Sequence, residues 1–250
     1  MSIEGKLLIL SLETATRAGS IAVSSVDLIL ATSAGQAQVS HSTQLLEQIN
    51  AVLDEAGVTL SQIELFAVAI GPGSFTGLRI GLATVKSFAA TLRRKCVGIP
   101  TLHAIAHGAG ESVCTVAMLP AGRGEVFAQR LSVSDMGSVQ PLDSPTHQAP
   151  QRLLDNFGQI RRLKWAGEGA QAHAEEIKAR ALSEGIAFRV ENSQASMSAA
   201  HDEWVLVDKA ELLAVSVAKL AHEHVRSGNT LLPQDIHAIY VRPSDAEMSK

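Results

Sequence analysis

The nine residues from Gly71 to Arg79, GPGSFTGLR, decide how the rest of the chain is interpreted. An apolar run, LFAVAI, precedes them at residues 65–70 and predicts a buried strand. Apolar residues at intervals of three and four follow over 78–92, and this spacing predicts an amphipathic helix. The order strand, glycine loop, helix directs backbone N–H groups and a helix N-terminus to one place, where an anion is the natural ligand.

Counting residues excludes two common phosphate-binding motifs. A Walker loop requires Gly-Lys-Ser/Thr, whereas Gly77 is followed by Leu78 and Arg79. The dinucleotide motif requires Gly-x-Gly-x-x-Gly, and Gly77 stands one residue too far along the chain for it. The spacing leaves two interpretations open, which are a ligand-binding loop and a tight turn that lets a helix pack closely on a sheet.

The segment from Gly71 to Ala90 resembles the signature block of the bacterial tRNA threonylcarbamoyladenosine biosynthesis proteins of the TsaB family, also called YeaZ. Three shorter stretches are similar to the same family in the same order: LILSLETAT at 8–16, HSTQLL at 41–46 and IYVR at 239–242. The similarity is densest up to about Pro100. It implies an α/β fold of two tandem ribonuclease H-like domains, as in the actin-like ATPase superfamily.

On this basis we expect three parts in the chain. Residues 1–108 would form an N-terminal ribonuclease H-like domain that contains the glycine loop and the partner-binding helices. Residues 109–207 would form a smaller C-terminal α/β domain, and a C-terminal helix and tail over 208–250 would pack back on the first domain. Within the second domain, the patterns predict strands at 113–118, 125–133 and 186–190, another strand that begins at Trp165, a loop over 136–151 and a helix over 172–182.

The composition indicates a globular protein with an aliphatic core. The 250 residues are 46% hydrophobic and 4% aromatic, with a formal net charge of −4. A protein that binds tRNA by itself normally has a basic face, and only the short clusters at 93–95 and 161–164 are basic here. Cys96 and Cys114 lack metal-ligand spacing, and the N-terminal apolar run is broken by Glu13, so we expect a cytoplasmic protein without a membrane span.

A candidate nucleotide site combines the glycine loop with the end of the first predicted strand. In the actin-like superfamily, the first turn carries an acidic residue near the metal-bound phosphates of the nucleotide, and Glu13 stands there. TsaB relatives more often have Asp at this point, which weakens the case for phosphoryl transfer, and a solvated turn residue is the other open interpretation. The candidate nucleotide-binding residues are Glu13, Gly71, Gly73, Ser74, Thr76, Gly77 and Arg79.

A second amphipathic helix is predicted over Thr43–Ala56, with Ser40 or Ser42 as its N-cap and Gly57 after its end. Its leucines would be buried either against their own sheet or against another subunit, and the sequence does not separate these two. The TsaB resemblance implies the second in part, because this helix and the helix after the glycine loop form the partner face of that family. The candidate interface residues are Leu45, Leu46, Ile49, Leu53, Leu82, Val85 and Ala89.

His103 and His107 lie four residues apart, so on a helix both imidazoles share one face, as a zinc pair would. TsaD, the catalytic relative of the family, carries such a pair just after the equivalent glycine block. Aligning the strand ends places those histidines on Thr101 and Ile105, about 200° of helix rotation away. We therefore expect no metal ligands and no catalytic residues in this chain.

The resemblance implies a subunit without activity of its own in a threonylcarbamoyltransferase complex. It would support a TsaD-type catalytic subunit, together with a TsaE-type ATPase, in transferring a threonylcarbamoyl group to the adenosine next to the anticodon of tRNA. We expect tRNA contact only through the complex, no tightly bound cofactor apart from ATP or ADP at a subunit interface, and a homodimer when the partner is absent. The alternative is an ATP-dependent kinase or hydrolase that uses Glu13, or a metallopeptidase that uses His103 and His107.

Overall fold

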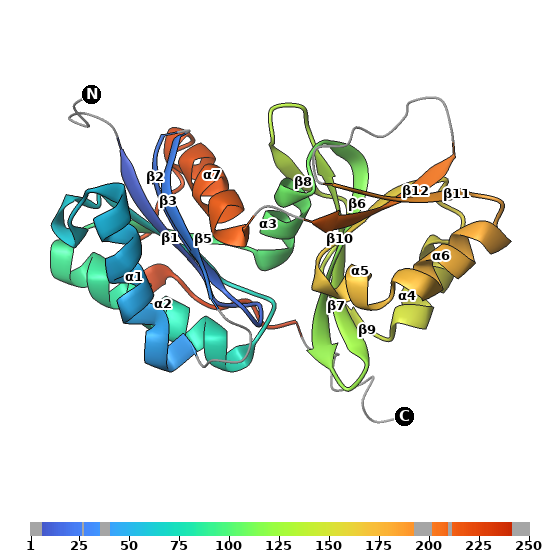
Figure 1. Cartoon of the computed structure of the whole chain (residues 1–250), viewed down its shortest axis with the longest axis horizontal. Helices are drawn as coiled ribbons and strands as arrows, with labels where there is room; N and C mark the ends of the chain where they lie inside the picture. The colour runs from blue at the N-terminus through green and yellow to red at the C-terminus, as the bar shows by residue number, and fades with distance from the viewer. Residues whose placement is uncertain (1–6, 27, 36–40, 193–201, 210–211, 242–250) are drawn as a thin grey trace. The chain divides into compact units, whose positions relative to one another are not determined.

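The structure is a computed structural model that describes residues 7–26, 28–35, 41–192, 202–209 and 212–241. The chain divides into two compact units, and each contains a β-sheet with helices (Figure 1). The first unit comprises residues 1–104 and 212–239, and the second comprises 105–211 and 240–250. The domain boundary expected at residue 108 falls just after this division, at the end of α3 (Thr101–Gly108). Arg242 and the expected N-cap Ser40 lie outside the described residues, as does the side chain of Ser42.

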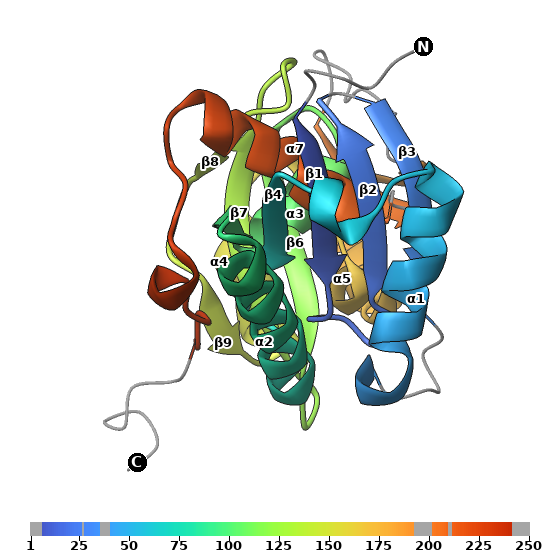
Figure 2. The same cartoon turned by 90° about the vertical axis from the view of Figure 1, so that its left-hand side faces the viewer.

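The first unit has a five-stranded sheet in the order β3-β2-β1-β4-β5. The first three strands form an antiparallel meander, and β4 and β5 run parallel to β1. Helices α1 and α2 cover one face of this sheet (Figure 2), and α7 packs on the other. The bounds are β1 (Leu8–Glu13), β2 (Ser20–Ser25), β3 (Leu28–Ala34), α1 (His41–Ala56), β4 (Leu65–Ala69), α2 (Phe75–Leu92), β5 (Lys95–Ile99) and α7 (Leu213–Arg226), with 3-10 turns η1 (Leu60–Gln62) and η2 (Pro233–Asp235).

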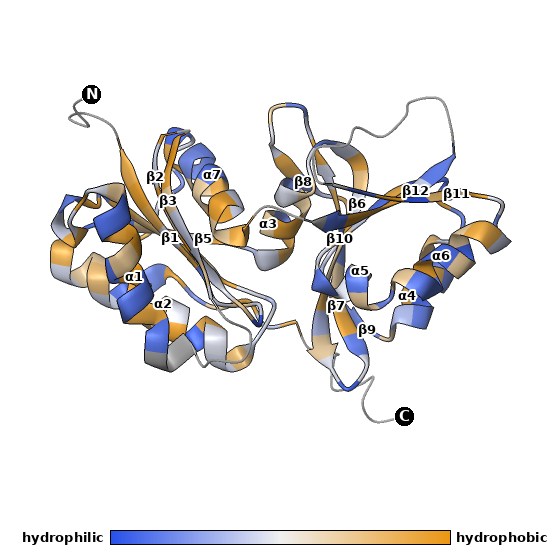
Figure 3. Ribbon diagram, in the orientation of Figure 1, coloured by the Kyte–Doolittle hydropathy of each residue, from blue (hydrophilic) through white to orange (hydrophobic). Residues whose placement is uncertain are grey.

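The two faces of β1 are chemically different, because successive side chains of a strand point to opposite faces. Leu10 and Leu12 join the aliphatic core under α1 and α2, and β1 is orange along most of its length in Figure 3. On the opposite face, the Ser11 hydroxyl donates to the carbonyl of Ala214 in α7 at 2.8 Å. Ser20 Oγ accepts from the N–H of the same Ala214 at 3.0 Å. These hydrogen bonds join α7 to strands about two hundred residues earlier, so the first unit is built from both ends of the chain.

The second unit has a sheet in the order β11-β12-β10-β6-β7-β8, and β9 also pairs with β7. Strands β6 and β7, the first two of this sheet along the chain, are antiparallel to each other. Strands β10, β12 and β11 run parallel to β6, so this sheet repeats the arrangement of an antiparallel meander followed by parallel strands. Its core gathers around the rings of Trp165 and Trp204, which are tilted by 55° to each other with centroids 5.1 Å apart. The bounds are β6 (Ser112–Gly122), β7 (Glu125–Val133), β8 (Val139–Pro141), β9 (Thr146–Gln148), α4 (Pro150–Phe157), β10 (Arg162–Ala166), α5 (Glu168–Ala172), α6 (Ala174–Ser183), β11 (Ala187–Asn192) and β12 (Glu203–Lys209).

The second unit differs from the predicted elements in three places. The loop over 136–151 contains β8, β9 and the start of α4, because three-residue strands that pair with β7 carry too little pattern to be detected. The helix predicted over 172–182 corresponds to α6, and the short helix α5 before it was not predicted. Strand β12, which the sequence did not predict, forms the centre of the parallel half of the sheet.

The C-terminal segment completes the first unit along the edge of β5. The N–H of Cys96 donates to the carbonyl of Leu231 at 3.0 Å, and the reciprocal bond from Leu231 measures 2.8 Å. Farther along, the N–H of Ile239 donates to the carbonyl of Ile70 at 2.7 Å. Between these two points the Ile236 side chain is buried in the core under α2. None of the helices in the described part of the chain is both long and apolar enough to cross a membrane.

We expect Ile236→Ala to lower the free energy of unfolding by about 2–5 kcal/mol, because it removes a fully buried side chain and leaves a cavity. Urea denaturation followed by circular dichroism measures this change. Leu232→Ala is the control, since Leu232 is 43% exposed in the same segment, and it should cost less than about 0.5 kcal/mol. Equal effects of the two substitutions would contradict the role of Ile236 as the residue that holds the segment.

Candidate functional site

The β1–β2 turn and the glycine loop meet at one edge of the first sheet. Strands β1 and β4 are parallel neighbours, so their carboxyl ends lie side by side. The N–H of Ser74 donates to the carbonyl of Ala15 at 2.8 Å, and the Thr14 hydroxyl donates to the carbonyl of Gly77 at 2.8 Å. The first turn of α2 is therefore docked on the turn that follows β1.

The glycines of the signature make this close approach sterically feasible. A Cβ atom on Gly77 would lie 1.9 Å from the carbonyl oxygen of Thr14, and one on Gly73 would lie 2.6 Å from that of Ala15. One turn farther along α2, a Cβ on Gly81 would lie 2.3 Å from the Thr14 hydroxyl oxygen. Atoms of Thr14 and Ala15 therefore occupy the space where side chains at these glycines would stand.

The N–H groups of the loop also have partners within the first unit. Gly71 donates to the Thr101 hydroxyl at 3.1 Å, and its carbonyl accepts from the N–H of Thr101 at 2.8 Å. Gly77 donates to the Ser74 hydroxyl, the N-cap of α2, at 3.2 Å. The N–H groups of Gly71, Ser74 and Gly77 are thus engaged in hydrogen bonds within the first unit. Thr76 is exposed at the start of α2.

Glu13 is buried, with 1% of its surface exposed, so its interpretation as a solvated turn residue was wrong. One carboxylate oxygen accepts from the N–H of Thr16 at 2.7 Å, and the other accepts from the Thr16 hydroxyl at 2.8 Å. The Thr16 hydroxyl in turn accepts from the N–H of Gly19 at 3.2 Å. The carboxylate therefore shapes the β1–β2 turn on which α2 is docked.

Arg79 is exposed in the first turn and a half of α2. Its guanidinium carbon stands 3.9 Å from the centre of the Phe75 ring, in cation–π geometry. Both side chains are exposed, and Phe75 is 49% exposed at the first position of the helix. The sequence analysis did not select Phe75, although it lies three residues before Leu78 and so continues the apolar spacing of three and four. An aromatic residue four positions before an arginine was the available signal.

The expected interface residues divide between the two sides of α1 and α2. Leu46 is 59% exposed and points away from the sheet. The other six are buried in the core of the first unit, so the apolar stripe that predicted an interface covers the chain's own sheet. In this fold, a partner cannot reach the side chains of these six residues, which are Leu45, Ile49, Leu53, Leu82, Val85 and Ala89.

The histidine pair of α3 is not joined by other ligating groups. Burial and the nearby charge of His224 lower the pKa of His103, which favours a neutral imidazole. Across the described ranges, no three His, Cys, Asp or Glu side chains gather as a metal-binding group. Burial raises the pKa of the Cys114 thiol to about 11 and raises that of Cys96, so both thiols stay protonated near neutral pH.

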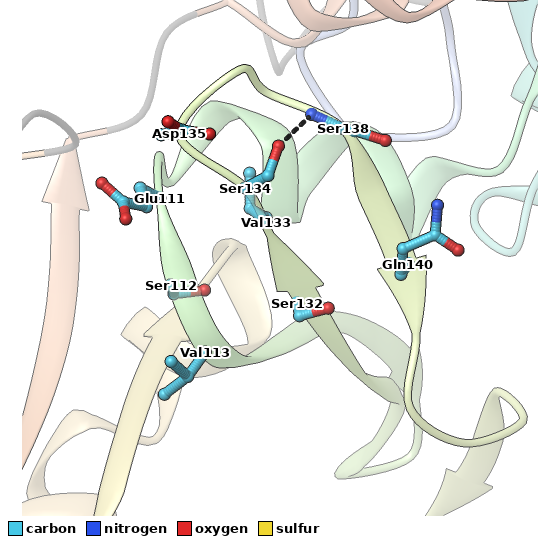
Figure 4. A pocket seen from close by; sticks show the side chains of 9 residues that line it. All are labelled: Glu111, Ser112, Val113, Ser132, Val133, Ser134, Asp135, Ser138 and Gln140. Carbon is cyan, nitrogen blue, oxygen red and sulfur yellow. Dashed lines mark hydrogen bonds between the residues drawn. The ribbon is translucent and has the colours of Figure 1, made fainter.

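A cavity of about 470 Å³ lies in the second unit, and none of its lining residues was selected as a site residue from the sequence. It opens where β6 begins and β7 ends, and the N–H of Ser138 donates to the Ser134 hydroxyl at 3.1 Å across one side of it (Figure 4). Its lining includes two carboxylates and four hydroxyls. Its residues are Glu111, Ser112, Val113, Ser132, Val133, Ser134, Asp135, Ser138 and Gln140.

Comparison with known proteins finds relatives for most of the chain. The model of a family described as TsaD, tRNA N6-adenosine threonylcarbamoyltransferase, matches residues 32–237. The tRNA threonylcarbamoyladenosine biosynthesis protein TsaB of Escherichia coli is 31% identical over 122 residues, which cover 48% of this chain and 52% of that protein. TsaB of Haemophilus influenzae is 33% identical over 94 residues, which cover 36% of this chain and 40% of that protein. The chain spans about half the length of the curated relatives that it matches.

Solved structures share the fold. YeaZ from Pseudomonas aeruginosa superposes with a TM-score of 0.73 at 22% identity, covering 94% of this chain and all of that one. A second Pseudomonas aeruginosa protein, described as similar to peptidase YEAZ, gives a TM-score of 0.74 at 23% identity with the same coverage. The activator of 2-hydroxyisocaproyl-CoA dehydratase from Clostridium difficile, solved with bound ADPNP, reaches 0.50 at 11% identity. At these identities the likeness concerns the fold alone.

We expect Gly77→Ala to lower the free energy of unfolding by about 1–3 kcal/mol, because the added methyl group overlaps the Thr14 carbonyl. The sign is informative, since helix propensity alone predicts a gain of up to about 1 kcal/mol from Gly→Ala. Urea denaturation measures the change. Ser87→Ala, at an exposed position of the same helix, is the control and should not destabilise. A stabilised Gly77→Ala variant would show that the docking of α2 on the turn is loose.

Proposed function

The chain belongs to the TsaD family, tRNA N6-adenosine threonylcarbamoyltransferase, on its TsaB (YeaZ) side, and we propose that it is a supporting subunit in tRNA threonylcarbamoyladenosine biosynthesis. In this role it binds a TsaD-type catalytic subunit and has no activity alone. The TsaD-type subunit performs the transfer of the threonylcarbamoyl group to the adenosine next to the anticodon. The family match and the TsaB relatives support the proposal.

The main support for a subunit without activity of its own is that the signature residues make contacts within the fold. Glu13 holds the β1–β2 turn through Thr16, and Gly77 lets α2 dock against Thr14. Residues at which a kinase or hydrolase would hold a nucleotide are thus engaged in setting the position of α2. The metallopeptidase alternative has little support either, because no other His, Cys, Asp or Glu joins the His103–His107 pair as a metal-binding group within the described part of the chain. Neither alternative enzyme is favoured.

We propose that the partner binds the outward side of α1 and α2. Both helices cover the same face of the first sheet and contact each other. Their inner residues are held in the aliphatic core, which keeps the outer residues in a defined position. Leu46 is the most exposed leucine of α1 and supplies apolar area on this side. The packed turn beneath α2 makes this surface a rigid platform for the catalytic subunit.

The remaining parts of the assembly are proposed from the same family membership. A TsaE-type ATPase joins the complex, tRNA is contacted only through it, and ATP or ADP lies at a subunit interface and not in the glycine loop. The net charge of −4 supports indirect contact with tRNA. Without its partner the chain forms a homodimer through the same helices. We propose that the protein is located in the cytoplasm.

We further propose that the two units are tandem ribonuclease H-like domains of the actin-like ATPase superfamily. Both sheets have an antiparallel three-stranded meander whose first strand is followed by parallel strands. The second sheet differs by the additional edge strand β11 and by β9. The Clostridium difficile activator, which carries ADPNP, supports a relation to nucleotide-binding folds.

The test is to mix the purified chain with the TsaD-type subunit of the same organism and to measure the mass of the species by size-exclusion chromatography with light scattering. We expect a stable heterodimer that replaces the separate species. Separate elution, with ATP and a TsaE-type ATPase also present, would refute the proposed role.

In the same assay, Leu46→Asp should abolish the heterodimer, because it places an unpaired charge in an apolar contact, while the fold is retained. Leu182→Asp is a matched control, since Leu182 is 60% exposed on α6 of the second unit, and it should leave binding unchanged. Ile49→Asp should unfold the first unit, since Ile49 is buried in its core. Unchanged binding by Leu46→Asp would place the interface elsewhere.

A further inference from the structure

Glu13 is a buried carboxylate that is hydrogen-bonded within the turn between β1 and β2. Its side chain stands at the end of β1, and only 1% of the residue is exposed. Taking a carboxylate out of water is costly unless hydrogen bonds replace the lost hydration. Thr16 supplies two such bonds, from its N–H at 2.7 Å and from its hydroxyl at 2.8 Å. The turn therefore cannot change shape without a loss of hydrogen bonds to a buried acid.

We propose that Glu13 is a positioning residue for the contact with the TsaD-type subunit. It fixes the start of α2 through the β1–β2 turn, and it joins this turn to α7 on the other face of the sheet. The inference rests on the proposed function. It adds a residue that determines the affinity of the complex although its side chain is too deeply buried to touch the partner.

The connection from Glu13 to α2 runs through the residues inside the turn. The Thr14 hydroxyl donates to the carbonyl of Gly77, in the first turn of α2, at 2.8 Å. The carbonyl of Ala15 accepts from the N–H of Ser74, the N-cap of α2, at 2.8 Å. Both bonds come from the part of the turn that the carboxylate closes. A change in the turn therefore moves the two groups on which α2 begins.

The connection from Glu13 to α7 runs through the Ser20 hydroxyl. Ser20 Oγ accepts from the N–H of Ala214, in the first turn of α7, at 3.0 Å, and so its own proton is available to an acceptor. The Glu13 carboxylate accepts this proton at 3.5 Å, a longer contact than those from Thr16. The first turn of α7 contains no acidic residue. The buried carboxylate, one side chain away, supplies the negative charge that stabilises a helix N-terminus.

The position of α2 matters for affinity because the partner is proposed to bind α1 and α2. Only molecules in which α2 is docked in the bound position are competent, and the apparent dissociation constant rises as their fraction falls. The core of a protein interface is packed as closely as a protein interior, so a small shift of a helix loses contacts. Since α7 is joined to the same carboxylate, Glu13 couples the C-terminal helix to the partner surface.

The experiment measures the dissociation constant of the complex with the TsaD-type subunit of the same organism by isothermal titration calorimetry. Glu13→Gln keeps the size of the side chain and removes its charge, and Thr16→Val removes the hydroxyl that donates to it. We expect each substitution to raise the dissociation constant at least about threefold. Because both act through one set of bonds, the double variant should bind less than about twofold more weakly than the poorer single variant.

Two controls separate positioning from a loss of stability. Glu203→Gln makes the same change at a carboxylate of the second unit that is 6% exposed and bonded to Arg189, and it should leave the dissociation constant unchanged. Ile63→Ala removes a buried side chain before β4 begins, at the edge of the first sheet opposite the turn. It should lower the free energy of unfolding without changing the affinity. Each titration is run at a temperature at which thermal unfolding shows the variant to be folded.

Hydrogen exchange tests the coupling without the partner. In Glu13→Gln, the amides of residues 74–78 and 213–217 should exchange faster than in the wild-type chain, whereas those of β5 should be unchanged. Faster exchange in all three segments would show a general loss of stability and would contradict the coupling. Unchanged exchange in either of the first two segments would contradict it as well.

The outcomes separate the two proposals. If the wild-type chain forms no complex, the proposed function fails, and this inference fails with it. If the complex forms and either Glu13→Gln or Thr16→Val binds within about threefold of the wild-type affinity, the inference is overturned while the proposed function stands. A double variant whose loss equals the product of the two single losses would also overturn it, because the two residues would then act independently.

Discussion

The close approach of α2 to the turn after β1 is the constraint on which the first unit depends. The carbonyl of Thr14 occupies the space where a side chain on Gly77 would stand, and the Thr14 hydroxyl is bonded to the carbonyl of the same glycine. This contact sets where α2 begins and therefore how its inner residues meet the sheet. Glu13 stabilises the same turn, because its buried carboxylate accepts two hydrogen bonds from Thr16. The glycine block thus joins α2 to the turn after β1.

Two segments from the end of the chain complete this unit. Helix α7 covers the small, hydroxyl-rich face of the sheet, and Ser11 binds its first turn. The segment that follows pairs with β5 at Leu231 and places Ile236 in the core. Such long-range contacts have a high entropic cost of loop closure, which burial of apolar side chains offsets. The unit that carries the proposed partner surface therefore requires the C-terminal residues for its stability.

The inner and outer sides of α1 and α2 have separate roles in this arrangement. The inner leucines stabilise the helices on the sheet, and a buried residue such as Ile49 has no surface left for a partner. On the outer side, Leu46 of α1 and Phe75 of α2 are exposed, and Arg79 lies over the Phe75 ring. Affinity in protein interfaces is commonly concentrated in a few such residues, so a small exposed set is sufficient for specific binding.

The sequence by itself determined the order of strand, glycine loop and helix, the α/β class and the family, because the periodicity of apolar residues and the glycine spacing are local properties of the chain. It did not determine which side of an amphipathic helix would meet a partner, since the same stripe serves a core and an interface. Only the tertiary structure decided that Gly77 faces Thr14, that Glu13 is buried and that β12 joins the second sheet. These facts arise from contacts between residues far apart in the chain, and no local pattern records which backbone will fill the space above a glycine.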